Sequence, residues 1–127
     1  MNEGVAKQTV RRILAEVFSA GRLDLIDELY HPGVAGKVRQ LATALRSAFP
    51  DLSLDVVHLI EEDHKVACHW RASGTQQGAF RNVPPTGAHV SFSGTSIYVF
   101  EAGKVAEIAS SWDVFGLLQQ LREALLR

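Results

Sequence analysis

The spacing of apolar residues changes at Pro50, and this change constrains the fold more than any other feature of the chain. Before Pro50, apolar residues recur every three or four positions, as in amphipathic helices. After it, the segment 54–60 begins an alternation with a period of two, which is typical of half-buried strands. Because the helical part precedes the strand part, we expect an α+β protein with helices covering one face of an antiparallel sheet.

Three helices are expected in the first 50 residues. Gly21 suits a left-handed C-cap that ends the first helix. A short second helix from Leu23 should stop at His31-Pro32-Gly33, and a third should end before Pro50, because a residue before proline avoids helical geometry. The buried stripe predicted for the first helix consists of Val10, Ile13, Leu14, Val17 and Phe18.

Four strands and a last helix are expected after Pro50. The stretch 75–87 is rich in glycine and proline and is predicted to be a long loop, and Gly94 should mark a bend or bulge. The last helix should bury Val114, Leu118, Leu121 and Leu125. The predicted strands are residues 54–60, 66–73, 90–100 and 105–112.

Composition limits the classes of function. The 127 residues are 46% hydrophobic and 21% charged, which suits one globular domain over residues 1–127. The formal net charge is −1 and the basic residues are scattered, so we expect no nucleic-acid partner. No apolar run approaches the roughly 18 residues of a membrane helix, and the N-terminus does not resemble a signal peptide. With Cys68 as the only cysteine, these features favour a cytoplasmic protein.

His58 and His69 are predicted to lie on one face of the first hairpin. If the turn pairs residues whose numbers sum to 125, His58 is opposite Ala67 and His69 is its diagonal neighbour, with Cβ atoms roughly 7–8 Å apart. Val56 and Ile60 would share this face. The pair could line a pocket and move a proton, or it could be structural or lie at a dimer interface. No third ligand with metal-site spacing accompanies it, so we expect no metal.

Aromatic residues are numerous enough to line a cavity for a flat ligand, although each could equally be core or interface. Trp70 and Trp112 are the preferred pocket residues because they lie near Asp113 and the Gly74-Thr75 end of their strands. The remaining aromatic candidates for the pocket are Tyr30, Phe80, Phe92, Tyr98 and Phe115, and Gln76 is a polar candidate for binding the ligand.

Several short motifs occur in a recognisable order from Phe49 onward. Phe49-Pro50-Asp51 precedes the first strand, and Gly74-Thr75 with Gly78 follows the second. The later motifs are Pro84-Pro85-Thr86-Gly87, Gly103-Lys104-Val105-Ala106-Glu107, Asp113 and Phe115 to Leu121. This ordered set resembles the SnoaL-like polyketide cyclase family of the NTF2-like superfamily. The resemblance implies a cone in which N-terminal helices pack on a strongly curved antiparallel sheet, followed by a C-terminal helix.

The resemblance also implies a role for Asp113. In the family, the aspartate at this position acts as a general acid and base in an intramolecular aldol closure, a reaction that needs no cofactor. A carboxylate in an apolar cavity suits proton removal and return. The resemblance therefore implies a cyclase, isomerase or dehydratase acting on a small hydrophobic carbonyl compound, with Asp113 assisted by His58, His69 or Tyr98. Asp113 also precedes a helix, so it could instead be a structural N-cap.

The chain departs from the family pattern at the pocket rim. Gln76 stands where relatives carry histidine, Ala109 stands where they carry tryptophan, and the segment 31–37 is shorter than usual. These departures favour an alternative of a different class, a non-catalytic small-molecule-binding or dimeric interaction module. An epoxide hydrolase would need an Asp-Arg-Asp arrangement, for which only Arg71 and Asp113 are evident.

A homodimer is expected because the sheet face that points away from the helices is predicted to be apolar. An exposed apolar face favours burial against a second copy. Phe92, Val99 and Ile108 are predicted to lie on that face. The alternative is a monomer whose last helix covers it. Cys68 is predicted to be a small buried residue.

Overall fold

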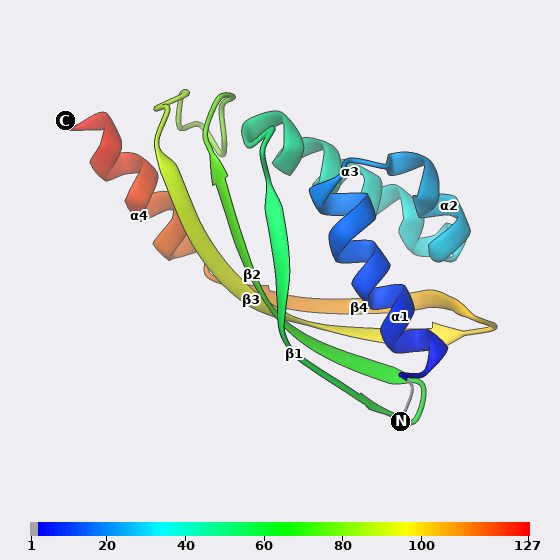
Figure 1. The fold of residues 1–127 in the computed structure, drawn as a ribbon. Coiled ribbons are helices and arrows are strands. Elements are labelled where there is room, and N and C mark those ends of the chain that lie inside the picture. The colour runs from blue at the N-terminus through cyan, green and yellow to red at the C-terminus, as the bar shows by residue number, and fades with distance from the viewer. Residues whose placement is uncertain (1–2) are drawn as a thin grey trace.

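Helices α1 (Val5–Arg12), α2 (Ile26–Leu29) and α3 (Pro32–Ala48) lie on one side of a strongly curved sheet (Figure 1). This arrangement, seen in a computed structural model that describes residues 3–127, confirms the expected α+β cone. The antiparallel strands follow chain order and are β1 (Ser53–Glu62), β2 (Lys65–Thr75), β3 (His89–Glu101) and β4 (Lys104–Trp112). The last helix, α4 (Val114–Leu125), lies beside β3 on the other side of the strands.

The first helix has the predicted buried face. It continues from α1 into a π-helical segment, Ile13–Ser19, and Gly21 follows with a φ of +76°. The Arg46 side chain from α3 donates hydrogen bonds of 2.9 and 2.8 Å to the carbonyl oxygens of Phe18 and Ser19. These carbonyls have no partner within the ending helix, so Arg46 ties the two helices together.

The chain between the second and third helices differs from the prediction. Pro32 does not stop a helix but begins one, because a proline at the first helical position loses no intrahelical hydrogen bond. The segment 31–37 is therefore almost entirely helical. A 2.9 Å hydrogen bond from the His31 amide to the Val105 carbonyl holds this junction against β4.

The turn of the β1–β2 hairpin lies one residue further along the chain than the predicted pairing requires, because Glu62 pairs with Lys65. Asp63 and His64 adopt positive φ angles of 49° and 65°, as in a two-residue turn that matches strand twist. The register also shifts between Val56 and His58, so that Val56 pairs with Trp70 and His58 pairs with His69. The predicted pairing of His58 with Ala67 was wrong, and Val56 does not share a face with Ile60, because the irregularity at Val57 changes the alternation.

Helix α4 completes the edge of β3 beyond the end of β4. The Gln120 amide nitrogen donates to the Ser91 carbonyl at 2.7 Å, and the Ser91 amide donates to the Gln120 side-chain oxygen at 3.1 Å. Leu117 and Leu121 are the buried residues of this helix, whereas Leu125 is exposed. In residues 3–127, no helix has both the length and the apolar character needed to cross a membrane.

Candidate functional site

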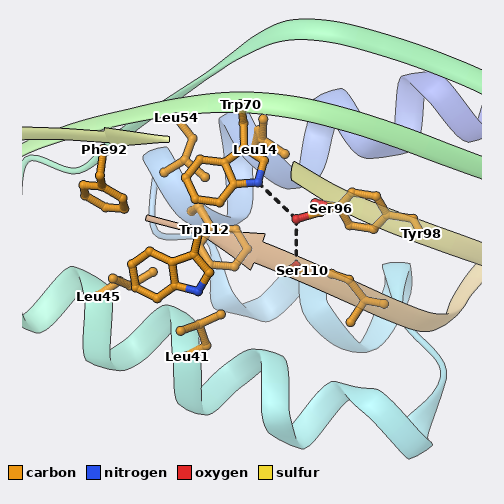
Figure 2. A pocket seen from close by; sticks show the side chains of 12 residues that line it. Leu14, Leu41, Leu45, Leu54, Trp70, Phe92, Ser96, Tyr98, Ser110 and Trp112 are labelled. Carbon is orange, nitrogen blue, oxygen red and sulfur yellow. Dashed lines mark hydrogen bonds between the residues drawn. The ribbon is translucent and has the colours of Figure 1, made fainter. Parts of the chain in front are cut away.

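The main cavity lies between the inner face of the sheet, the π-helical segment Ile13–Ser19 and helix α3 (Figure 2). Its cavity volume is about 60 Å³, and it opens to solvent at a mouth. Leu41 and Ile108 stand at the mouth and remain 44% and 36% exposed. The lining residues are apolar apart from three hydroxyls and two indole N–H groups, and they are Leu14, Phe18, Leu41, Leu45, Leu54, Trp70, Phe92, Ser96, Tyr98, Ile108, Ser110 and Trp112.

Gly94 allows the two tryptophans to meet in this cavity. It pairs with Trp70 on one neighbouring strand and with Trp112 on the other, so all three residues form one row across the sheet. A Cβ atom at Gly94 would lie 2.5 Å from the Trp112 Cβ and 2.6 Å from Cζ2 of Trp70. Gly94 therefore marks a close approach of the two tryptophans to its backbone, where a bend was expected. The two indole rings pack with their centroids 6.5 Å apart.

A line of hydroxyl groups crosses one end of the cavity. The Trp70 indole N–H donates to the Ser96 hydroxyl at 3.0 Å, and the Ser96 and Ser110 hydroxyl oxygens lie 2.7 Å apart (Figure 2). Ser96 is buried, whereas Ser110 is exposed at the mouth. Ser96 can accept from Trp70 and still donate, so this line joins the dry interior to the solvent side.

Tyr98 adds a neutral hydroxyl to the same end. Burial raises the pKa of Tyr98 far above its ordinary value, and a hydrogen bond with Ser96 opposes the rise. A hydroxyl with a raised pKa stays protonated at neutral pH and can donate a hydrogen bond. The cavity therefore offers hydrogen-bonding groups without a formal charge.

Asp113 is exposed and is absent from the lining of this cavity. Its Oδ1 accepts a 2.8 Å hydrogen bond from the Gly116 amide, so the side chain caps α4. This carboxylate therefore does not face the cavity, which was the first of the two expectations. It caps the helix, which was the alternative. The reason is local, because the first amides of a helix attract the nearest carboxylate.

His58 and His69 lie on the outer face of the sheet, away from the cavity. Their rings are nearly parallel, at 11°, and their Nδ1 atoms are 3.2 Å apart. His58 is exposed and His69 is half-buried. In the described part of the chain, no third His, Cys, Asp or Glu joins them in a potential metal site.

Three other candidates lie near the cavity without lining it. The Gln76 side chain is fully buried in the 76–88 loop, where it donates to the Val83 carbonyl and accepts from the amide and hydroxyl of Thr86. Phe80 packs against Phe49 at a centroid distance of 5.8 Å. Tyr30 is buried and lines an adjoining hollow. Gln76 uses its polar atoms to close the loop, so none is turned to a ligand in the cavity.

Several cavity residues were missed in the sequence. Phe92 was predicted both as a pocket candidate and on the outer face, and Ile108 on the outer face alone; the outer-face prediction was wrong, because both residues line the cavity. Alternation along β3 places Phe92, Ser96 and Tyr98 on one face, so the parity of Tyr98 could have located the other two. Ser110 could have been found in the same way from Trp112. The packing of Leu41 and Leu45 from α3 depends on helix placement and has no comparable signal.

The fold and cavity together define a class, that of cone-shaped α+β proteins in which a curved sheet and N-terminal helices enclose a hollow. The sequence profile of the SnoaL-like polyketide cyclases matches residues 8–121. The chain therefore belongs to the SnoaL-like polyketide cyclase family. None of the curated proteins compared with it is a match.

Solved structures agree with this assignment. A candidate polyketide cyclase from Acidithiobacillus ferrooxidans is 25% identical, with a TM-score of 0.86 over 98% of this chain and 99% of that one. AclR from Streptomyces galilaeus, described as a candidate hydroxylase, is 26% identical, with a TM-score of 0.85 over 93% of this chain and 81% of its own. A candidate SnoaL-like cyclase from Jannaschia sp. CCS1 is 22% identical, with a TM-score of 0.86 over 95% and 96% of the two chains. Similar folds thus accompany different descriptions of activity.

Proposed function

We propose that this protein binds a small, flat, hydrophobic molecule with a carbonyl or hydroxyl oxygen in the main cavity. The observation that carries the proposal is the hydroxyl line at one end of an otherwise aromatic and aliphatic hollow. Apolar walls with a few placed polar groups are typical of small-molecule sites. Trp70, Trp112 and Phe92 supply flat surfaces, and Ser96, Ser110 and Tyr98 supply hydrogen bonds for one oxygen.

Binding of 2-acetylnaphthalene, a flat ketone, tests this proposal by isothermal titration calorimetry. Leu41→Trp at the mouth should block the cavity and weaken binding at least tenfold. Leu125→Trp is the matched control, because Leu125 is similarly exposed, at 46% against 44%, but lies on α4 outside the cavity. Absence of binding by the natural sequence, or equal weakening by both variants, would contradict the proposal.

The geometry favours binding without chemistry at Asp113. General acid–base catalysis needs the carboxylate within hydrogen-bonding reach of the ligand. Asp113 instead caps α4 in an exposed position, and no carboxylate or imidazole is among the residues that line the main cavity. A binding module, rather than an enzyme that uses this aspartate, is therefore the function we favour.

An acid–base enzyme, such as a cyclase, isomerase or dehydratase, is the second candidate, and membership of the family supports it. Asp113 directly follows Trp112, a cavity residue, and only its Oδ1 is used in the cap. Asp113→Asn separates the two candidates in assays on flat diketones that can undergo aldol closure. Asparagine also caps helices, so loss of turnover with intact folding would identify an enzyme. Turnover by neither protein would support a binding module.

We also propose that two copies associate through the outer face of the sheet. One row across all four strands is apolar and consists of Ile60, Ala67, Ile97 and Ala109. Ile60 and Ile97 are 64% and 43% exposed, which suits burial by a second copy. The neighbouring row holds no carboxylate, lysine or arginine, and it consists of His58, His69, Thr95 and Ser111.

Light scattering coupled to size-exclusion chromatography tests the dimer. Ile97→Lys should shift the protein to a monomer, because it places a charge in the apolar row. Phe115→Lys serves as the control, since Phe115 is 76% exposed on α4, away from that row. A natural sequence that is monomeric at every concentration, or a dimer unaffected by Ile97→Lys, would refute this association.

A further inference from the structure

The main cavity continues into a second hollow on the side of α2 and α3. Phe18, Leu41, Ile108 and Ser110 line both spaces, so the two hollows adjoin at the mouth. The second hollow has a volume of about 220 Å³ and is open to solvent. Tyr30, Lys37 and Val38 line only the second hollow, and the first two add a phenol and an ammonium group to its set of lining residues.

Tyr30 is one of the residues that line this second hollow, and its hydroxyl is unsatisfied. The side chain is only 1% exposed, and its Oη has no hydrogen-bond partner within residues 3–127. A buried polar atom without a partner is costly, so it needs an explanation. Burial, followed by the nearby Tyr98 hydroxyl, raises the pKa of Tyr30, which keeps the group neutral and able to donate. An oxygen atom of a bound molecule would satisfy it.

Lys37 is the only charged residue among those that line the two hollows. It forms no ion pair in the described part of the chain, whereas Arg39, two residues further along α3, lies 3.2 Å from Asp27. A lysine beside an apolar mouth that pairs with no carboxylate of the protein can form an ion pair with the carboxylate of a ligand. Its position at the rim also allows a charged group to stay partly hydrated, which limits the cost of desolvation.

We propose that the two hollows form one groove for a flat aromatic carboxylic acid. The rings lie against Trp70 and Trp112, and the carboxylate points to the end that holds Tyr30 and Lys37. This inference rests on the proposed function and adds the chemical class of the ligand. Tyr30 contributes a hydrogen bond from the dry side of the groove, and Lys37 contributes a positive charge from the wet side.

Two probes with the same rings test this assignment. Naphthalene-2-carboxylate carries the acid, and 2-acetylnaphthalene carries a neutral carbonyl of similar shape. Both tryptophans of the chain line the main cavity, so either probe can be followed by tryptophan emission and checked by calorimetry. The acid should bind roughly 3–10-fold more tightly at pH 7 and low salt, because a charged acceptor strengthens hydrogen bonds at a partly exposed site.

The variants assign this preference to its residues. Lys37→Met should reduce acid binding to the level of the ketone and leave ketone binding unchanged. Lys7→Met makes the same change in net charge on α1, outside both hollows, and should preserve the preference. Tyr30→Phe should weaken acid binding roughly threefold, in line with one lost hydrogen bond, and raise the urea midpoint of the free protein by removing the unpaired hydroxyl.

The outcomes separate this inference from the proposed function. Equal affinity for the two probes, unaffected by Lys37→Met, would overturn the acid assignment while leaving the proposed site intact. Binding of neither probe would overturn both. An acid preference that Lys7→Met also abolishes would reflect net charge only, and it would overturn the role of Lys37.

Discussion

Replacement of Gly94 by alanine tests whether the cavity depends on the close approach of its two tryptophans. The added Cβ would lie 2.5 Å from the Trp112 Cβ, 2.6 Å from the Trp70 ring and 2.8 Å from the Ser111 carbonyl oxygen. Ordinary contacts between carbon atoms are about 3.5–4.0 Å. A Cβ and a backbone oxygen cannot move away as the end of a flexible side chain can, so the strands or the indoles must shift.

The cost can be estimated from these contacts. Overpacking of a core by one methyl group costs typically about 1–3 kcal/mol, and three short contacts justify the upper part of that range. Alanine recovers roughly 0.5–1 kcal/mol because it has less backbone freedom in the unfolded chain than glycine. The free energy of unfolding should therefore fall by about 2 kcal/mol. With a urea m-value of about 2 kcal/mol/M, the midpoint should fall by about 1 M.

Urea unfolding followed by circular dichroism measures this change, and tryptophan emission reports on the cavity directly. Gly36→Ala is the matched control, because Gly36 lies inside α3 and a Cβ there meets nothing within 4 Å. It should raise the unfolding free energy by roughly 0.8–1 kcal/mol through helix propensity. A Gly94→Ala protein with a midpoint at or above that of the natural sequence and unchanged emission would refute the close-approach argument.

Three further predictions concern single groups. Asp113→Ala should lower the free energy of unfolding by about 1 kcal/mol, because the Gly116 amide loses its cap, whereas Asp113→Asn should preserve the stability. Equal stability in urea of both variants and the natural sequence would contradict the capping role. Ser96→Ala should lower the free energy of unfolding by about 1–3 kcal/mol, because it leaves the buried indole N–H of Trp70 unpaired. An unfolding temperature equal to that of the natural sequence would argue against that hydrogen bond. Burial raises the pKa of the Cys68 thiol to about 11, so the native protein at pH 8 should react with a disulfide reagent far more slowly than the urea-unfolded chain; rapid native reaction would show that the thiol is accessible.

The helices and strands were predictable because their signals are local. The stripe from Val10 to Phe18 is buried as expected, and α3 ends at Ala48 before Pro50. Gly21 takes the positive φ that its position predicts. Each of these features depends on residues within a few positions along the chain, so the sequence contains the necessary information.

The positions of the candidate site residues were harder to predict. His69 lies outside the cavity because it directly precedes Trp70 on β2, and successive side chains of a strand point to opposite faces. His58 lies beside it because the two residues pair across the hairpin. A change of one residue in register moves a side chain to the opposite face. The Asp113 side chain had two chemically reasonable positions, one facing the cavity and one capping α4. In the folded protein it accepts a hydrogen bond from the Gly116 amide and caps the helix.

The sequence by itself determined the order of helices and strands, the segments of the core and the family, because hydrophobic period and turn residues act over short distances. Only the tertiary structure decided what faces the hollow. The space between the sheet and α3 is what remains after distant side chains have packed, so no single segment encodes it. For the same reason, no local pattern predicts that the Tyr30 hydroxyl is unpaired or that Lys37 lines the second hollow. Both features depend on how α2, α3 and β4 pack together.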